Sequence, residues 1–472
     1  MSPLELSPAN FRELAHNTVE LAADYLETLD ARPIFPPTSG EETERLFRAP
    51  LPENGLGERA FDALGNLIDQ SRAHNGRFFG YVHSPGEPVA ALGDLVASIL
   101  NQNITAWRSA PAAVTIERVV VHWLAEAIGC PEFSGSLTGG GSSANLMALA
   151  MAREAKIPAN DGGLYSRPPA VIYASDEIHM SIPKALALLG LGRNRLRPLP
   201  TDSQFRMVPG ELERVIREDK VAGKVPMAVV ASAGTVNSGA VDPLADIAAI
   251  ARSHGLWLHV DGAYGALAAI AAPSQFTGLN QADSLSLDPH KWLYQPLDCG
   301  CLLYRDAALA RKTFAYTGDY ARTFTDDPVE GFAFFEESIE LSRCFRALKL
   351  WLSLRYHGVS AFRQAIQRDL EHAQRLAAAV RNCSALELAA PVELSAVCFR
   401  HLVTATASEE ERNRFNRALL KRIQLRGRIY LSNAELRGKF CLRACIVNHR
   451  TTDADIDSVV PEVLAAAHEC VG

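Results

Sequence analysis

The sequence predicts an α/β protein whose large domain is built on a mostly parallel sheet and is followed by a small α+β domain. Between about residues 88 and 358, short strands that are apolar along their whole length alternate with helical stretches. This pattern is typical of a parallel sheet covered by helices on both faces. Polar residues follow these strands directly, and ligands of such sheets bind at the carboxyl ends of the strands. The sequence therefore predicts a ligand site at that edge of the sheet.

The N-terminal segment, residues 1–87, begins with a predicted amphipathic helix over residues 7–29. Ser7 is placed to cap this helix and Pro8 takes its first position, while Phe11, Leu14 and Leu21 fall on one apolar stripe. Such a helix has no core of its own. We therefore expect it to pack on another domain or on a second subunit.

Residues 88–360 form the predicted large domain, and its strands carry the clearest pattern. Apolar runs predict buried strands at 170–174, 227–231, 256–260 and 284–287, which lead into Ser175-Asp176, Ser232, Asp261 and Asp288 respectively. The stretch 244–254 predicts one of the helices between them.

Residues 361–472 form the predicted small domain. The expected elements are a helix over 361–381, a strand near 396–402, a helix over 409–424, strands near 429–431 and 440–447, and a last helix that starts at about 452.

Composition excludes several classes of protein. The 472 residues are 48% hydrophobic and 21% charged, as in ordinary globular proteins, and the net charge of −7 argues against a nucleic-acid or anionic-membrane binder. There is no apolar run of the roughly 18 residues that a membrane helix needs, and the first residues do not resemble a signal peptide. The nine cysteines are scattered without a CxxC pair or a zinc-site spacing. We therefore expect a cytoplasmic protein with reduced cysteines, no metal site, no nucleic-acid partner and no membrane partner.

The strongest local signal is the segment Ser286-Leu287-Asp288-Pro289-His290-Lys291-Trp292. A lysine just after a buried strand can be held in a dry pocket, where its amine forms a Schiff base with an aldehyde cofactor. The alternative is a surface lysine beside a turn.

A second signal is the carboxylate of Asp261 at the tip of another buried strand, in the segment His259-Val260-Asp261-Gly262-Ala263-Tyr264. A buried charge needs a partner, and a pyridinium nitrogen is one such partner. The alternative is that Asp261 caps a helix. Because Lys291 and Asp261 follow successive strands, both side chains are expected to face one ligand.

Three further segments follow strands. The loop Thr138-Gly139-Gly140-Gly141-Ser142-Ser143 runs into a helical pattern, where free backbone N–H groups and hydroxyls suit a phosphate; a plain turn is the alternative. His179 can stack on a flat ring or act as an acid, or it is an ordinary loop histidine. The segment 234–239, which contains Thr235, also lies at a strand tip.

The order of these five segments resembles the group II pyridoxal-phosphate decarboxylases, the family of aromatic-L-amino-acid decarboxylase. The resemblance runs from about Phe78 to His449. It implies pyridoxal 5'-phosphate as cofactor and fold type I with a seven-stranded type of sheet. It also implies a homodimer with shared active sites, in which the N-terminal segment wraps over the partner.

The resemblance also implies roles for individual residues. Cofactor binding falls to Gly140, Gly141, Ser142, His179, Thr235, Asp261, Asp288 and Lys291. Catalytic roles fall to Lys291, which holds the internal aldimine, and to Asp261, which pairs with the pyridine nitrogen. His179 stacks on the ring, and His290 lies beside the Schiff base. Tyr320 protonates the quinonoid carbon from a mobile loop. Substrate binding falls to Tyr81, Ser84 and His179.

The sequence departs from the family pattern at several positions. Val236 replaces a threonine, and Asp288 replaces an asparagine. Since a carboxylate close to a phosphate would repel it, we expect Asp288 to point elsewhere. Ala73, Asn103 and Thr105 replace the Trp, Ile and Phe that line the aromatic pocket in the animal enzyme. They predict a wider, more polar pocket.

The predicted activity is decarboxylation of an L-amino acid to the amine and CO2, and an aromatic amino acid is the favoured substrate. Two alternatives keep the cofactor: an aldehyde synthase that decarboxylates and deaminates oxidatively, and a decarboxylase of a non-aromatic amino acid. Tyr320 favours the amine, because the aldehyde-forming branch of the family has Phe there. A catalytically silent dimeric paralogue is a third alternative, against which Lys291, Asp261, His179 and Tyr320 argue.

Overall fold

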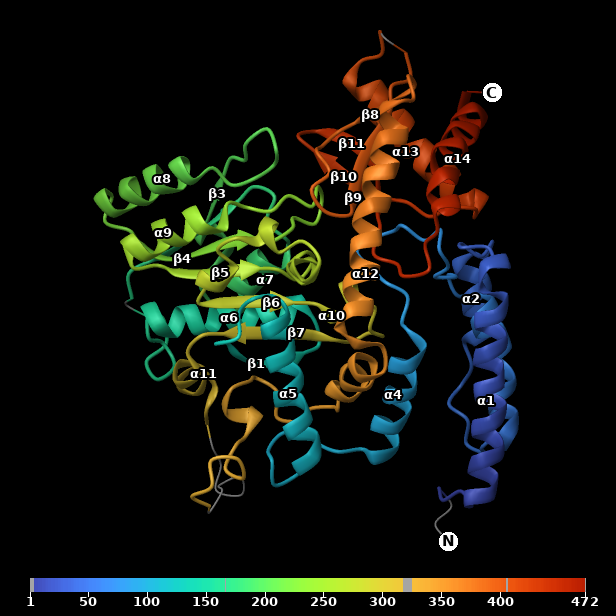
Figure 1. Ribbon diagram of the computed structural model, residues 1–472, viewed down its shortest axis with the longest axis horizontal. Coiled ribbons are helices and arrows are strands. Elements are labelled where there is room, and N and C mark those ends of the chain that lie inside the picture. The colour runs from blue at the N-terminus through green and yellow to red at the C-terminus, as the bar shows by residue number, and fades with distance from the viewer. Residues whose placement is uncertain (1–3, 166, 317–324, 405, 472) are drawn as a thin grey trace.

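The computed structural model describes residues 4–165, 167–316, 325–404 and 406–471. Figure 1 shows three parts along the chain: N-terminal helices at one side, a large α/β part, and a C-terminal α+β part at the end of a long helix. In the described ranges, no helix combines the length and apolarity that crossing a bilayer requires.

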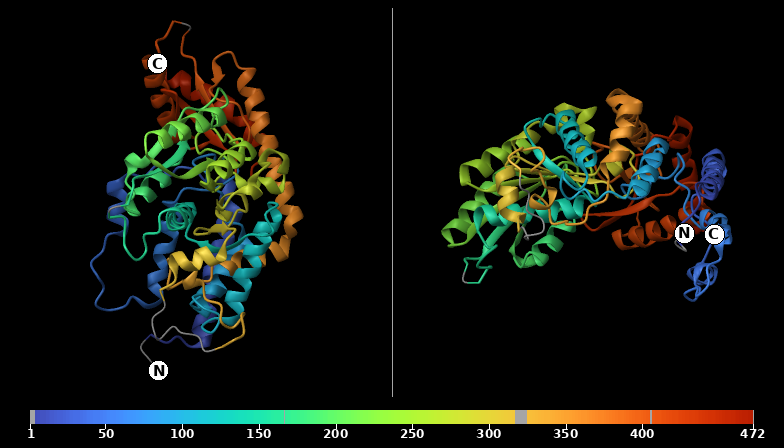
Figure 2. Two further views of the ribbon diagram at one scale, coloured as in Figure 1. Left: turned by 90° about the vertical axis from the view of Figure 1, so that its left-hand side faces the viewer. Right: turned by 90° about the horizontal axis from the view of Figure 1, so that it is seen from below.

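The N-terminal part consists of α1 (Pro8–Thr28), α2 (Gly40–Phe47) and α3 (Ala63–Asp69). Ser7 caps α1 as predicted, because its Oγ accepts a hydrogen bond from the backbone N–H of Asn10 at 3.1 Å. No residue of α1 is buried, and the helix stands apart from the sheet in Figures 1 and 2. Its own chain therefore covers its apolar stripe only in part, since Leu14 and Leu21 are half-buried and Phe11 is exposed.

The large part is built on a seven-stranded sheet in the order β1-β7-β6-β5-β4-β2-β3. The strands are β1 (Ser134–Thr138), β2 (Ala170–Ser175), β3 (Leu196–Leu199), β4 (Val225–Ser232), β5 (Trp257–Asp261), β6 (Ser284–Leu287) and β7 (Gly300–Tyr304). Only β7 runs against its neighbours β1 and β6, and the other neighbouring strands pair in parallel. The predicted mostly parallel sheet is confirmed, and the four predicted strands are β2, β4, β5 and β6.

Helices cover both faces of this sheet. The helices of the large part are α4 (Pro88–Leu100), α5 (Pro111–Ala127), α6 (Gly141–Lys156), α7 (Ser181–Leu188), α8 (Pro209–Val221), α9 (Leu244–His254), α10 (Pro289–Trp292) and α11 (Ala307–Phe314). Of these, α4 packs on the helix that follows them, residues 347–381, and not on the sheet. Successive residues of β2 pack on opposite faces: Ile172 and Ala174 join the core formed with α6 and α7, whereas Val171 and Tyr173 join the core formed with α8 and α9. Burial on both faces explains why these strands are apolar throughout.

The long helix α12 (Ala347–Arg381) leads into the C-terminal part. The helix predicted over 361–381 corresponds to the second half of α12. The break that separates the two halves of α12 is Gly358, whose φ of 74° favours glycine. The residues before that break are also helical. The boundaries predicted at 87/88 and 360/361 remain predictions; the second falls within α12.

The C-terminal part packs a four-stranded antiparallel sheet, in the order β10-β11-β9-β8, against α12 and α13, and α14 packs on these two helices. Its elements are β8 (Leu386–Leu388), β9 (Ala396–His401), α13 (Glu409–Arg426), β10 (Ser432–Leu436), β11 (Lys439–Cys445) and α14 (Asp453–Val471). The strand predicted near 429–431 is a single parallel β-bridge between Tyr430 and Phe78, and the strand β10 begins only at Ser432. Tyr430 is buried against the N-terminal part, where its ring stacks on Phe78 at 4.9 Å, whereas Ile429 and Leu431 join the core of the C-terminal part.

Candidate active site

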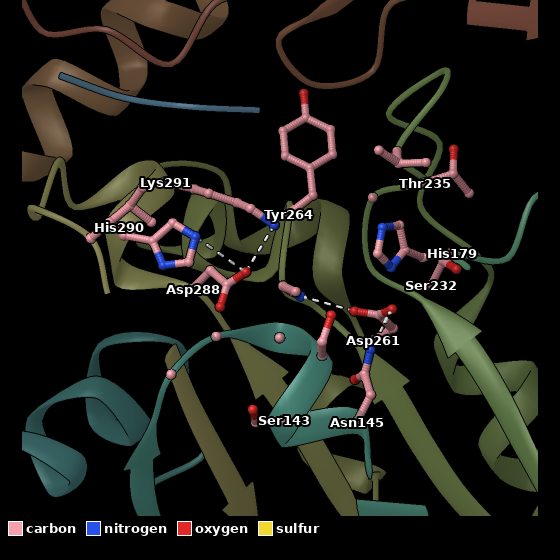
Figure 3. Close-up of a pocket in the computed structure, with 18 residues that line it drawn as sticks. Ser143, Asn145, His179, Ser232, Thr235, Asp261, Tyr264, Asp288, His290 and Lys291 are labelled. Carbon is pink, nitrogen blue, oxygen red and sulfur yellow. Dashed lines mark hydrogen bonds and ion pairs between the residues drawn. The ribbon is translucent and has the colours of Figure 1, made fainter. Parts of the chain in front are cut away.

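Loops that follow β1, β2, β4, β5 and β6 enclose a pocket of about 310 Å³ (Figure 3). It lies at the predicted edge of the sheet. The sequence-predicted residues that line it are Gly140, Gly141, Ser142, His179, Thr235, Asp261, Asp288, His290 and Lys291. The structure therefore brings together side chains that lie up to 151 positions apart in the sequence, from Gly140 to Lys291.

The glycine loop after β1 brings the N-terminus of α6 to the pocket. Gly140 has a φ of 142°, in the region that favours glycine. At Gly141, a Cβ would lie 2.6 Å from the Cβ of Ala263, so any side chain would force the loop away from its neighbour. Within the described part of the chain, the N–H groups of Gly141 and Ser142 have no acceptor. This helix start is thus open to an anion.

The carboxylate of Asp261 is held at the tip of β5 by three donors. Asn145 Nδ2 donates to Oδ2 at 2.9 Å, while Ser286 Oγ and the N–H of Ala263 donate to Oδ1 at 3.1 and 3.2 Å. Asp261 is only 6% exposed. Since a carboxylate accepts about four hydrogen bonds, its remaining capacity is available to a cation or N–H group in the pocket.

His179 lies in the loop between β2 and α7 and lines the pocket near Thr235 and Asp261 (Figure 3). Its Nδ1 is 2.8 Å from Ser181 Oγ and accepts the N–H of Ser181 at 3.3 Å. Burial lowers the pKa of His179 below its usual range. The ring is therefore neutral near pH 7, with its proton on Nε2.

Lys291 lies in the short helix α10 after β6, and its side chain is 17% exposed. Its Nζ is 2.9 Å from Asp288 Oδ2, and His290 Nε2 is 3.6 Å from the same oxygen. His290 donates from Nδ1 to the carbonyl of Cys299 at 2.7 Å, and burial lowers the pKa of His290. The expectation that Asp288 points elsewhere is wrong: the ammonium of Lys291 attracts its carboxylate into the pocket.

Thr235 and Val236 follow β4 and line the same pocket. Thr235 is 2% exposed, and its Oγ1 lies 2.8 Å from Ser238 Oγ. Val236 has no side-chain hydrogen-bonding group, so this edge of the pocket offers only one threonine hydroxyl.

The predicted substrate residues Tyr81 and Ser84 are not among the residues that line this pocket. Ser84 is buried and donates from Oγ to the carbonyl of His290 at 2.6 Å, which ties it to the segment of Lys291. Tyr81 is half exposed, and its hydroxyl lies 3.0 Å from that of Tyr430. The substrate-binding roles of both remain predictions.

The three positions expected to set specificity also lie away from the pocket of this chain. Ala73 is buried, whereas Asn103 is exposed and Thr105 is half-buried. Tyr320 lies outside the described residues.

Sequence reasoning missed the partners of Asp261. Asn145 and Ser286 are buried polar residues that contact its carboxylate. Asn145 lies four positions after Gly141, so the two share one face of α6. That spacing is the signal that could have placed Asn145 in the pocket.

These residues fit a cofactor that carries an aldehyde, a basic ring nitrogen and a phosphate. The open N–H groups of Gly141 and Ser142 suit the phosphate. Lys291 supplies a primary amine, and Asp261 supplies a carboxylate with one free acceptor position. Asp288 is the one unfavourable feature, because its buried Oδ1 has no hydrogen-bond partner in the described part of the chain and lies 3.9 Å from the Cβ position of Gly140.

Comparison with known proteins agrees with this fit. The model of the pyridoxal-dependent decarboxylase conserved domain matches residues 62–402. The chain is 36% identical to an aromatic-L-amino-acid decarboxylase of Bacillus atrophaeus, over 99% of this chain and 97% of that one. It is also 31% identical to a phenylacetaldehyde synthase of Petunia hybrida, over 93% and 91% of the two chains.

A crystal structure of Oryza sativa TDC with PLP and tryptamine has the same fold. It superposes with a TM-score of 0.93 at 28% identity, and all of both chains is covered. The family model and the relatives together identify the fold, the cofactor and the class of reaction. The chain therefore belongs to the pyridoxal-dependent decarboxylase family, and it is a carboxy-lyase that uses pyridoxal 5'-phosphate.

Proposed function

We propose that this enzyme decarboxylates an aromatic L-amino acid to the corresponding amine and CO2. The observation that carries the proposal is the convergence of Lys291, Asp261 and His179, from three different loops, on one pocket whose glycine-loop side suits a phosphate. The relatives with aromatic substrates in their names support the choice of substrate class.

Each residue in the pocket has a distinct task in this proposal. When bound, the cofactor supplies an electron sink for the electrons that remain at the substrate α-carbon after CO2 leaves. Lys291 offers its Nζ to the aldehyde. Gly140, Gly141, Ser142 and Thr235 hold the phosphate side, with Asp288 beside them. Asp261, fixed by its three donors, keeps a proton on the ring nitrogen.

The remaining residues orient the cofactor and the substrate or deliver a proton to the substrate. His179 lies against the face of the ring and, being neutral, adds no positive charge there. His290 is held by the carbonyl of Cys299 beside Lys291. Ser84 and Tyr81 contribute to substrate binding, and Tyr320 delivers a proton to the substrate α-carbon.

We also propose that the enzyme acts in the cytoplasm as a homodimer with shared sites. The partly covered apolar stripe of α1 and the exposed apolar side chains of α4, including Leu92, Val96 and Ile99, support a second copy as the covering surface. Nine cysteines without disulfides support a reducing compartment.

Product analysis over a panel of substrates tests the proposal. Purified enzyme is incubated with each standard L-amino acid, dihydroxyphenylalanine and hydroxytryptophan, and amine, CO2, aldehyde and hydrogen peroxide are measured together. We expect equal amounts of amine and CO2 from an aromatic substrate. Turnover of non-aromatic substrates alone would contradict the aromatic assignment.

The second candidate function is an aldehyde synthase, which the similarity to phenylacetaldehyde synthase favours. Tyr320 favours the amine instead. Aldehyde and peroxide formed in equal amounts by the wild-type enzyme would select the second candidate.

A further inference from the structure

Asn145 lies between Asp261 and His179, at the centre of a buried chain of hydrogen bonds. Its Nδ2 is 2.9 Å from Asp261 Oδ2 and 2.9 Å from Ser181 Oγ, and its Oδ1 is 2.8 Å from His259 Nε2. Ser181 Oγ in turn lies 2.8 Å from His179 Nδ1. Asn145, Ser181 and His259 are each at most 3% exposed. Water therefore cannot replace these bonds.

The direction of every bond in this chain follows from its neighbours. A carboxylate only accepts hydrogen bonds, so the side of Asn145 that faces Asp261 must be its NH2 group. Its carbonyl oxygen then faces His259. Because that oxygen also only accepts, His259 must carry a proton on Nε2.

The other end of the imidazole completes the assignment. Burial lowers the pKa of His259 to about 4, so the ring is neutral near pH 7 and its Nδ1 is bare. Nδ1 lies 3.0 Å from Ser284 Oγ, which accepts the indole N–H of Trp257 at 2.9 Å. Ser284 is thus free to donate its own proton to His259. The tautomer of His259 is fixed from the Nε2 side by Asn145, since Nδ1 also lies 3.2 Å from the backbone carbonyl oxygen of Ser284, which has no proton to donate.

The same reasoning assigns the ring proton of His179. Ser181 Oγ accepts one N–H of Asn145, so its own proton is free to go to His179 Nδ1. The backbone N–H of Ser181 also points at this nitrogen. Both contacts require a bare Nδ1, and the proton of His179 is kept on Nε2.

We propose that Asn145 is a positioning residue, held in one orientation by His259, that sets both the carboxylate of Asp261 and the ring proton of His179 for the cofactor. This inference rests on the proposed cofactor-binding roles of Asp261 and His179. Asn145 lines the pocket but acts in this role through Asp261 and Ser181, and His259, which does not line the pocket, acts through Asn145.

A matched pair of variants at position 259 tests this role. Glutamine and methionine have similar length, and both remove the imidazole, but only the amide of His259→Gln can donate to Asn145 Oδ1. The dissociation constant of pyridoxal phosphate, measured by equilibrium dialysis of the full-length enzyme, is the first readout, and kcat for the best substrate is the second. The urea midpoint of each variant reports the integrity of the fold.

We expect His259→Met to bind the cofactor about 10-fold more weakly than the wild type and His259→Gln to restore the affinity to within about threefold. Asn145→Leu, which removes the donor to the Asp261 carboxylate, should weaken binding about 10- to 100-fold. Equal losses in the Gln and Met variants would overturn the proposal, since loss of packing would explain both. Wild-type affinity in Asn145→Leu would also overturn it.

The variant Asp261→Asn separates this inference from the proposed function. If it keeps both cofactor affinity and turnover, the role of Asp261 on which this inference rests is wrong, and the substrate panel still decides the proposed function. If it loses them while Asn145→Leu keeps them, the proposed function stands and the positioning role of Asn145 is wrong.

Discussion

Replacing Asp261 by asparagine removes one charge from the pocket and leaves the size of the side chain unchanged. The three groups around this side chain, on Asn145, Ser286 and Ala263, are all donors. An asparagine can turn its carbonyl oxygen to one side only, so its NH2 group must face a donor. An unmatched buried donor costs about 1–3 kcal/mol. We expect the free energy of unfolding to fall by about that amount.

The effect on the rate should be larger. Asp261 is 6% exposed, so an effective dielectric constant of about 20 is appropriate, and opposite charges about 4 Å apart then attract by about 4 kcal/mol. Since about 1.4 kcal/mol corresponds to a tenfold change in rate, Asp261→Asn should lower kcat about a thousandfold. The assay is CO2 release at saturating cofactor, with cofactor occupancy measured by absorbance.

Ser286→Ala is the matched control for this experiment. It removes one donor to Asp261 but keeps the charge, so we expect a loss of tenfold at most. If fully loaded Asp261→Asn turned over within about threefold of the wild type, the carboxylate would have no electrostatic role and the reasoning would be refuted.

Three other predictions concern Gly141, Tyr320 and His259. Gly141→Ala should weaken cofactor binding and destabilise the fold by about 1–3 kcal/mol, because its Cβ would lie 2.6 Å from that of Ala263; calorimetric titration with pyridoxal phosphate checks this, and unchanged affinity would show that the loop adapts. Tyr320→Phe should lower amine and raise aldehyde and peroxide, because a positioned acid contributes about 10²–10⁴-fold to proton transfer; an unchanged product ratio would exclude Tyr320 as the donor. The pKa of His259 is lowered from 6.5 to about 4 in the folded protein. As the pH falls, the unfolded chain therefore binds a proton at this histidine before the folded chain does. The contribution of neutral His259 to the free energy of unfolding is thus present above pH 6.5 and is lost as the pH falls towards 4. Urea unfolding between pH 6.5 and 4 should show a smaller decrease in the free energy of unfolding for His259→Gln than for the wild type. An equal decrease in both proteins would contradict this.

Much of the fold could be predicted because the apolar periodicity of its central elements is strong. The strands β2, β4, β5 and β6 are buried on both faces, so an apolar run identifies each of them. The helix α9 was predicted with the bounds that the structure has. The difference at residues 429–431 has the same origin, because an apolar run reports burial and does not show that pairing there is limited to one bridge between Tyr430 and Phe78. Tyr430 is buried by Phe78, which lies hundreds of residues away in the sequence.

The candidate site was predictable only where residues follow strand ends. That rule located Lys291, Asp261 and the glycine loop. It could not show that Asp288 turns into the pocket, because the attraction that orients it depends on the position of Lys291 Nζ. The same rule could not find Asn145 and His259, because their roles depend on the direction of hydrogen bonds between three separate elements.

The central claim is that Lys291 carries the cofactor in a pocket where Asp261 and His179 orient it. Borohydride reduction of the full-length enzyme, followed by proteolysis and mass spectrometry, tests this claim most directly, because reduction fixes the cofactor to its lysine. We predict a single peptide that carries reduced pyridoxal phosphate on Lys291, and no such peptide in Lys291→Ala. A modification on another lysine, or wild-type turnover by Lys291→Ala, would contradict the account.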